Sequence, residues 1–515
     1  MYMIECNKFI MNELKVIDRG VINQNIIFCD ITDQGEIINY SYQQFEDLID
    51  KIKSYLLSKY NIRPGETAVV GYENTCVHKI AAFFACLELG LSITIIDHQP
   101  KFDNSSLTVT ATDGTKIQSV DTKTQLLSPI NYFICGKDRL DVENDPKSKS
   151  FFLHNYCSNT IYHNDITNFS YDKAICNDLK IDPKSIAMRC TSSGTTGTPK
   201  VIEHTHEFLF DLCKRNSKMF YGNIVNEKCL GHGSGPSTYF IPTLMSKNVE
   251  KVFNFWGETD DFIPAKYPIR NENLFDHIMI AYTHDIDIYL EDIDDNHPAS
   301  NLTIYTLSTI KKEWISYVKD KKIKNIISLF GSSETAGPIF INQANDENFV
   351  QNKFSLIDEY YKVSFTNKNL LEVLIPVYNK KINTNDEFLI DANNKDFYHN
   401  GRSDLIRING KNVNISKCDK ILSKLNTILD AKFIYDTAIN EIYLAVWESS
   451  SQKSSILRDT ETLDSLIKKI NVKMLEFSSS HHYISKYQVL DQAPFFTGIK
   501  LDNQLLRDYF RSIDN

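Results

Sequence analysis

Helix and strand patterns alternate in the first part of the chain, and this alternation constrains the fold more than any other feature. Ser41 and Gln44 have the spacing of a capping box before a helix, and apolar residues then recur at helical spacing. The next predicted elements are a strand at 67–70, an apolar helix at 78–89 that ends at Gly90, and a strand at 93–96. Such alternation predicts an α/β fold with helices on the faces of a sheet.

Further helices and strands can be predicted beyond residue 320, whereas residues 101–180 show no clear periodic pattern. The predicted elements are a strand at 326–329, strands at 433–435 and 442–447, and a helix with an apolar stripe from 463 to 474. With 515 residues the chain is too long for one core, so two or three domains are expected. The last part, about 110 residues, is large enough for a small α+β domain.

Composition narrows the class of protein. The apolar content of 42% and the charged content of 24% are ordinary for a globular protein. The net charge of −10 without a basic stripe argues against nucleic acid as a partner. Eleven scattered cysteines without a CxxC pair indicate a reducing compartment, and we expect a cytoplasmic protein. No signal peptide and no apolar run long enough to insert into a membrane is predicted.

The segment from Cys190 to Lys200 (CTSSGTTGTPK) combines hydroxyl groups, two glycines and a terminal lysine. Backbone amides freed by glycine, hydroxyl donors and a cation are suited to hold a polyphosphate. Gly194 and Gly197 do not have the spacing of the common phosphate loop. Taken alone, the segment is equally typical of a flexible Ser/Thr/Gly surface loop.

Three further motifs and a C-terminal lysine follow in a fixed order, and together with this loop they resemble the signatures of the adenylate-forming superfamily. That superfamily includes acyl-CoA synthetases, aryl- and acyl-acid ligases and adenylation domains. The matching segments are Phe330-Gly331-Ser332-Ser333-Glu334, Asn383-Thr384-Asn385-Asp386, Gly401-Arg402-Ser403-Asp404 and Phe496-Thr497-Gly498-Ile499-Lys500. The resemblance extends over nearly the whole chain.

The resemblance implies a large N-terminal AMP-binding α/β domain with layered sheets (1–402) and a small mobile C-terminal α+β lid domain (403–515), with the hinge near Asp404. It also implies an ATP- and Mg²⁺-dependent ligase. In the first half-reaction a carboxylic acid becomes an acyl-adenylate. In the second, the acyl group passes to a thiol, either CoA or the phosphopantetheine of a carrier protein.

The resemblance assigns roles to individual residues. Thr195, Thr196 and Lys200 would contact the β- and γ-phosphates, and Lys500 would bridge the carboxylate and the α-phosphate. Glu334 would bind Mg²⁺ from the loop after a strand. The remaining nucleotide-binding residues would be Thr191, Ser192, Ser193, Gly194, Gly197, Phe330, Gly331, Ser333, Asp386 for the ribose, and Arg402.

The chain departs from the family pattern at several positions, among them the segment Leu307-Ser308-Thr309-Ile310, which lacks the glycines of the family's adenine-side motif. Val201 replaces a glycine after the loop, and Asn385 replaces a glycine at a turn that asparagine is expected to preserve. Gly498 lies two residues before Lys500 instead of one. These changes keep open the alternative of a catalytically weak nucleotide-binding or regulatory member. A luciferase-like enzyme that oxidises its adenylate is a further alternative.

The acyl pocket is predicted around residues 231–236. Gly233 and Gly235 leave room for substrate, and His232 is either the gate of the thiol tunnel or a structural histidine. No aspartate lies between Gly231 and Met245 to pair with an α-amino group. We therefore expect an aryl or a short- to medium-chain acid, used in secondary metabolism, and not an amino acid. For His204 and His206 we prefer a structural role over metal binding.

Overall fold

The computed structural model describes most of the first 402 residues and a set of strands after them. The described residues are 15–32, 36–71, 76–95, 109–110, 116–117, 127, 129–144, 149–171, 180–191, 200–225, 235–255, 275–280, 286, 289–290, 293, 299–307, 310–311, 313–345, 349–350, 353–367, 369–391, 396–402, 406–408, 411–413, 429–436, 441–448, 486–490, 496–497 and 500–501. From residue 400 onward, the described strands are given by their backbone alone.

Helix α1 (Tyr42–Lys59) begins where the sequence predicts. The Ser41 hydroxyl accepts a hydrogen bond from Gln44 N, and the Gln44 side chain accepts one from Ser41 N at 2.8 Å, which completes the capping box. Helix α2 (Val77–Glu88) is buried on nearly every side. It is followed by Gly90 with φ of +71°, the left-handed conformation that a glycine C-cap requires. Both helix predictions are confirmed.

A six-stranded sheet lies beside these helices. Its strands in spatial order are β10 (Val201–Thr205), β9 (Ile186–Thr191), β4 (Ser92–Thr94), β3 (Thr67–Gly71), β7 (Tyr132–Cys135) and β8 (Asn159–Tyr162). All neighbours are parallel except β9 and β10, which form an antiparallel hairpin. Short helices that the sequence did not reveal flank this sheet: α4 (Arg139–Asn144), α5 (Lys149–Tyr156) and α6 (His163–Thr167).

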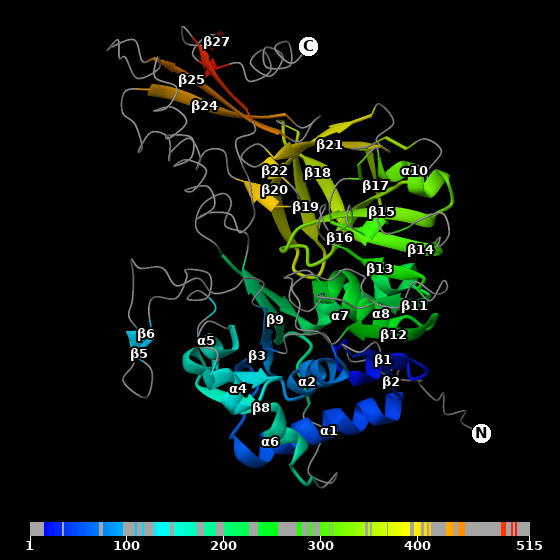
Figure 1. The fold of residues 1–515 in the computed structure, drawn as a ribbon, viewed down its shortest axis with the longest axis vertical. Helices are drawn as coiled ribbons and strands as arrows, with labels where there is room; N and C mark the ends of the chain where they lie inside the picture. The colour runs from blue at the N-terminus through cyan, green and yellow to red at the C-terminus, as the bar shows by residue number, and fades with distance from the viewer. Residues whose placement is uncertain are drawn as a thin grey trace, which may run out of the picture.

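A thirteen-stranded sheet forms the larger layer of the described chain (Figure 1). Its spatial order is β18 (Lys362–Phe365), β19 (Leu370–Ile375), β20 (Lys380–Ile390), β21 (Phe397–Arg402), β17 (Lys353–Leu356), β16 (Pro338–Gln343), β15 (Ile323–Gly331), β14 (Ala299–Thr306), β13 (His277–Met279), β11 (Gly222–Val225), β12 (Val249–Phe255), β1 (Ile27–Ile31) and β2 (Ile37–Tyr40). The run from β15 to β1 is parallel, and β2 and the strands from β16 onward pair antiparallel.

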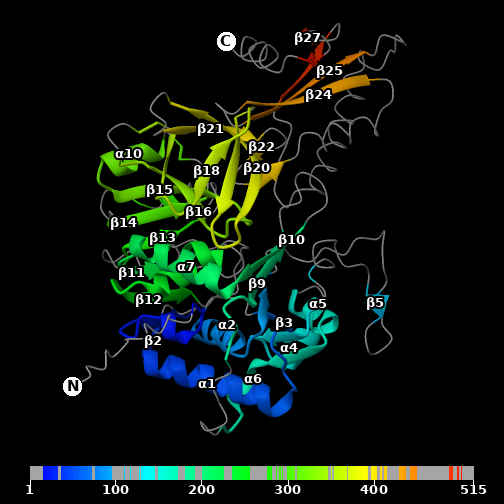
Figure 2. The ribbon, with the colours of Figure 1, turned by 180° about the vertical axis from the view of Figure 1, so that it is seen from behind.

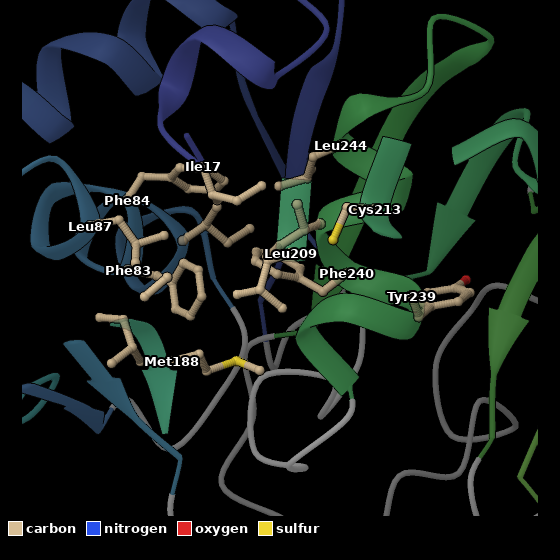
Figure 3. Packing of buried hydrophobic residues seen from close by; sticks show 14 of the residues in the cluster. Ile17, Phe83, Phe84, Leu87, Met188, Leu209, Cys213, Tyr239, Phe240 and Leu244 are labelled. Atoms are coloured by element: carbon tan, nitrogen blue, oxygen red, sulfur yellow. The ribbon is translucent and has the colours of Figure 1, made fainter. Parts of the chain in front are cut away.

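The core between the two sheets is built from helices. The helices that follow β10 are α7 (His206–Asn216), the π-helical turn η5 (Pro236–Phe240) and α8 (Ile241–Met245). Helix α10 (Trp314–Lys319) lies elsewhere, because its Trp314 belongs to a separate apolar cluster with residues of β14 and β15. Figure 3 shows Phe83 of α2 facing Phe240 of η5, and their ring centroids are 5.8 Å apart. Met188 of β9 joins the same apolar cluster. This packing gives the layered α/β fold that the alternating pattern predicts.

Strands after residue 402 form smaller sheets. They are β22 (Ile406–Ile408), β23 (Lys411–Val413), β24 (Leu429–Asp436), β25 (Glu441–Glu448), β26 (Lys486–Leu490), β27 (Phe496–Thr497) and β28 (Lys500–Leu501). Strands β24 and β25 are antiparallel and contain the two strands predicted there. The helix predicted at 463–474 lies outside the described residues. Among the helices that the structure describes, none has the length and apolar character needed to span a bilayer.

Candidate functional site

The predicted phosphate-binding segment joins the two strands of the β9–β10 hairpin. Thr191 is the last residue of β9, is buried, and pairs with Val201, the first residue of β10. Lys200 is exposed directly before β10. Both ends of the segment are therefore fixed by one sheet, and Figure 2 shows this hairpin between the six-stranded sheet and strands β18–β20. Six predicted phosphate ligands lie outside the described residues: Ser192, Ser193, Gly194, Thr195, Thr196 and Gly197.

The predicted metal ligand Glu334 lies in a turn directly after β15, as expected from the apolar run before it. We call residues 332–337 the Glu334 turn. Inside this turn, the Thr335 hydroxyl donates to Gly337 O at 2.9 Å and accepts from Ser332 N at 3.0 Å. Ala336 has φ of +54°, which is strained for a residue with a side chain. Strain of this kind persists only where surrounding contacts fix the backbone.

Neighbouring elements supply those contacts. The Tyr361 hydroxyl donates to Thr335 O at 2.6 Å, and the Ser237 hydroxyl of η5 donates to Ala336 O. Arg215 of α7 donates to Pro338 O at 2.9 Å. A Cβ atom on Gly331 would lie 2.3 Å from Gly337 O, so only glycine fits where β15 enters the turn. The backbone on both sides of Glu334 is thus held by several separate elements.

The Glu334 carboxylate itself is partly exposed. It forms no hydrogen bond or ion pair with any described residue. A carboxylate on a rigid turn with its oxygens unengaged has the chemistry that Mg²⁺ requires of a ligand shared with phosphate oxygens. The residues present therefore fit a magnesium ion.

Strand β10 contacts the Glu334 turn directly. His204 Nε2 lies 2.9 Å from Ser333 O, although the two residues are 129 positions apart. Thr205 N donates to the Tyr378 hydroxyl at 2.9 Å, so the end of β10 is held at a second point. The strand that leaves the predicted phosphate loop and the turn that carries the predicted metal ligand are therefore neighbours.

The two histidines after the loop do not form a metal-binding pair. His206 is the first residue of α7 and its Nδ1 accepts from Ile17 N at 3.3 Å, whereas His204 points to Ser333. Burial lowers the pKa of each imidazole to about 4. No group of three metal-ligating side chains occurs among the described residues. The geometry agrees with the structural role preferred from the sequence.

Asp386 lies inside β20, and the turn expected at Asn385 is not present. Strand β20 runs through this position, and the ladder with β21 shifts register between Asp386 and Phe388. Pairing with β19 and β21 thus prevails over the turn preference of the Asn-Thr-Asn-Asp segment. The bulge leaves Asp386 buried, with its Oδ1 atom 3.4 Å from His399 Nε2.

An aromatic cluster links Asp386 to the start of the Glu334 turn. The Phe330 ring lies 5.0 Å from the His399 ring and 5.2 Å from the Phe388 ring. The sequence did not indicate His399, Tyr361 or Ser237 as functional residues. His399 approaches Asp386 through the pairing of β21 with β20, which no local pattern in the sequence indicates.

Of the remaining predicted site residues, some are described only by their backbone and others lie outside the described residues. Gly235 begins the helical segment that continues as η5, while His232 and Gly233 lie outside the described residues. Asp404, the predicted hinge, also lies outside them. The backbone of Arg402 pairs with Asp386 at the end of β21, and the backbone of Lys500 pairs with Thr497 between β28 and β27.

Residues 23–225 match the sequence model of the family described as AMP-binding enzyme. No curated protein sequence matches the chain. The solved structures with a similar fold include three that match along nearly their whole length.

One is a double mutant of o-succinylbenzoate CoA synthetase from Bacillus subtilis, with 14% identity, a TM-score of 0.60, and coverage of 95% of this chain and 97% of that chain. A second is the amide bond synthetase McbA from Marinactinospora thermotolerans, with 14% identity, a TM-score of 0.63 and coverage of 96% and 98%. A third is a fatty acyl CoA synthetase from Mycobacterium tuberculosis, with 12% identity, a TM-score of 0.57 and coverage of 97% and 99%.

Proposed function

We propose that this chain, which matches the AMP-binding enzyme family over residues 23–225 and has the fold of adenylate-forming ligases, activates a carboxylic acid with ATP and transfers the acyl group to a thiol. The thiol is CoA or the phosphopantetheine of a carrier protein. A solved structure with this fold, an o-succinylbenzoate CoA synthetase, is in complex with ATP and magnesium ion, and another is an adenylation domain with its carrier domain.

The observation that carries the proposal is the contact between β10 and the Glu334 turn. A carboxylate that attacks ATP must approach a group of like charge, so the reaction needs cations aimed at the phosphates. Lys200 ends the loop that precedes β10, and Glu334 follows Ser333, which His204 of β10 contacts at 2.9 Å. A lysine and a potential metal ligand from distant parts of the chain therefore lie next to two segments that contact each other.

In the proposed first step, an oxygen of the acid attacks the α-phosphorus of ATP. The bond between the α-phosphorus and the pyrophosphate oxygen breaks, and pyrophosphate leaves. Thr195, Thr196 and Lys200 hold the leaving phosphates, and Lys500 neutralises the two reactants as they meet. A magnesium ion bound by Glu334 would withdraw charge from the phosphate oxygens. Asp386 accepts hydrogen bonds from the ribose hydroxyls, and Arg402 contacts ribose and phosphate oxygens.

In the proposed second step, the thiol sulfur attacks the acyl carbon. A carbon–sulfur bond forms, the bond from the acyl carbon to the adenylate oxygen breaks, and AMP leaves. Rotation of the C-terminal region about Asp404 would exchange the group that faces the adenylate between the two steps. We assign the thiol tunnel to the segment with His232 and Gly233, and its wall to Gly235.

The substrate class follows from what the pocket segment lacks. The sequence from Gly231 to Met245 contains no aspartate to pair with an α-amino group. In the described part of that segment, Pro236, Ser237 and Tyr239 are buried, and the Ser237 hydroxyl donates a hydrogen bond to Ala336 O. We therefore propose an aryl acid or a short- to medium-chain acyl acid.

The test is acid-dependent exchange of labelled pyrophosphate into ATP with a panel of aryl, acyl and amino acids. We expect exchange with aryl or acyl acids and none with amino acids. Lys500→Ala should abolish exchange while ATP binding persists, because this lysine is assigned to the reacting groups. Absence of exchange across the panel by a protein that binds ATP would contradict the proposal and favour a nucleotide-binding protein without ligase activity.

A further inference from the structure

His204 has an unusual environment for a residue on an edge strand. Strand β10 pairs only with β9 in its sheet, and His204 is its one buried residue, with 1% of its surface exposed. Its ring lies against Phe208 of α7 with the centroids 5.4 Å apart. The imidazole therefore points away from solvent and toward the interior between β10, α7 and the Glu334 turn.

The contact with Ser333 fixes the tautomer of His204. A carbonyl oxygen only accepts, so Nε2 must carry the hydrogen and donate it to Ser333 O at 2.9 Å. Burial lowers the pKa of His204 to about 4, so near neutral pH the ring has a single N–H. Its other nitrogen, Nδ1, is buried without a partner among the described residues. An apolar side chain would avoid that unpaired atom, so packing alone does not account for a histidine here.

The hydrogen bond holds one side of Glu334. Ser333 O also accepts from Ala336 N at 3.2 Å, so both of its lone pairs are used. On the other side of Glu334, Thr335 O is held by Tyr361 and Ala336 O by Ser237. Of these three side chains, only His204 belongs to the strand that continues from the predicted phosphate loop.

We propose that His204 is a positioning residue that fixes the metal-binding carboxylate of Glu334 relative to Lys200, the residue directly before β10. The proposal rests on the proposed function, because it requires that both groups serve one nucleotide. Both are charged partners of the same triphosphate, so a small displacement of one relative to the other weakens the simultaneous contacts. His204 acts through Ser333 O and contacts no substrate itself.

The test is the gain in ATP affinity that Mg²⁺ provides, measured by calorimetry on the full chain with ATP in Mg²⁺ and in EDTA. His204→Leu removes the hydrogen-bond donor and introduces an apolar side chain of similar size. We expect its gain from Mg²⁺ to fall by about tenfold, as loss of one well-placed contact implies, while the Kd for ATP in EDTA changes little. In His204→Gln the amide reaches the position of Nε2 and donates to Ser333 O, so the gain should return.

Ser246→Ala is the control, because it removes a buried hydrogen bond to a backbone carbonyl, Phe220 O, at the end of α8, together with a longer one accepted from Asn248 N at 3.3 Å. If His204→Leu does not fold, His204→Asn replaces it, since the shorter amide falls short of Ser333 O. An unchanged Mg²⁺ gain in the donor-free variant, or a loss equal to that of Ser246→Ala, overturns the role of His204. That result leaves acid-dependent exchange by the wild type intact, whereas a wild type that fails to bind ATP overturns both proposals.

Discussion

At the scale of single residues, the two carboxylates assigned to the nucleotide have different surroundings. Glu334 stands on a turn whose backbone is fixed, and its oxygens engage no described residue. Asp386 is buried at a bulge, and its Oδ1 atom lies 3.4 Å from His399 Nε2. His399 therefore holds the carboxylate in one orientation, which suits a group that must accept two hydrogen bonds from a diol.

Asp386→Asn should weaken ATP binding. An amide has one acceptor oxygen in place of two and loses the charge, and hydrogen bonds to charged groups are worth about 1.5–3 kcal/mol. We expect the Kd for ATP to rise by about tenfold or more, measured by calorimetry. Glu387→Gln is the control, because Glu387 is the adjacent carboxylate on β20. Equal effects of the two substitutions would contradict the assignment of Asp386 to the ribose.

Asp30 is a buried carboxylate outside the candidate site. Its oxygens accept from Val77 N at 3.0 Å and from Asn254 Nδ2 at 2.9 Å, so it caps the start of α2. Burial nevertheless raises the pKa of Asp30 to about 6, against 3.8 for an exposed aspartate. Because the folded state binds this proton more tightly than the unfolded state, the contribution of Asp30 to stability is greatest below about pH 4 and is lost as the pH rises to 6.

Asp30→Asn removes this titration. Relative to the variant, the wild type should therefore lose up to about 3 kcal/mol of unfolding free energy between pH 4 and pH 7. Chemical denaturation of both proteins across that range measures the difference. Asp320→Asn, on an exposed turn, should track the wild type at every pH. A wild type whose stability relative to Asp30→Asn stays constant or rises between pH 4 and pH 7 would contradict this assignment.

Short sequence motifs were enough to assign residues to the nucleotide, but they did not indicate which side chains hold those residues in place. Glu334 and Asp386 lie in short motifs that can be recognised from a few consecutive residues. Their partners come from elsewhere: Ser333 meets His204 across 129 positions, and Thr335 meets Tyr361 across 26. Such contacts follow from the arrangement of the sheets, which no local pattern encodes.

At the scale of elements, a buried ion cluster joins the segment before β1 to α1 and α2. Arg19 contacts Glu88 and Asp50 at 2.6 Å each, and Lys53 contacts Glu88 at 2.8 Å. The four side chains are nearly shielded from solvent. Because a buried charge is costly without its partner, the cluster fixes how α1 and α2 lie against the segment before β1.

Arg19→Met should leave Glu88 and Asp50 insufficiently paired and should lower the unfolding free energy by about 3–5 kcal/mol. Arg139→Met is the matched control, because Arg139 pairs with Glu143 at 2.8 Å on an exposed helix surface. The control should cost less than about 1 kcal/mol. Denaturant midpoints of the two variants give the comparison, and equal losses would show that the Arg19 cluster adds no more than a surface pair.

Helices α1 and α2 were predicted from the sequence, whereas α7 and the short helices were not. Helix α1 has a capping box and an apolar stripe, and α2 ends at a glycine with positive φ. By contrast, α4 to α6 have six, eight and five residues, too few for a periodic pattern to be recognised. The turn predicted at Asn385 failed for another reason: hydrogen bonding to two neighbouring strands prevailed over local preference.

At the scale of the whole molecule, the two sheets meet at the candidate site. The six-stranded sheet supplies β9, β10 and the two ends of the predicted phosphate loop, and the thirteen-stranded sheet supplies the Glu334 turn and Asp386. The order of the motifs predicted a resemblance to the adenylate-forming superfamily, and residues 23–225 match the AMP-binding enzyme family while the fold resembles that of solved CoA synthetases. It could not predict which sheet carries which motif, because order along the chain does not determine strand order in space.

The most direct test of the account follows the atoms of the acid. A responsive acid with both carboxyl oxygens labelled with ¹⁸O is incubated with ATP, Mg²⁺ and the thiol acceptor, and the AMP is analysed by mass spectrometry. Attack on the α-phosphorus followed by cleavage of the acyl carbon–oxygen bond predicts one ¹⁸O atom in each AMP. Unlabelled AMP, or ADP and phosphate in its place, would contradict acyl-adenylate formation by this protein.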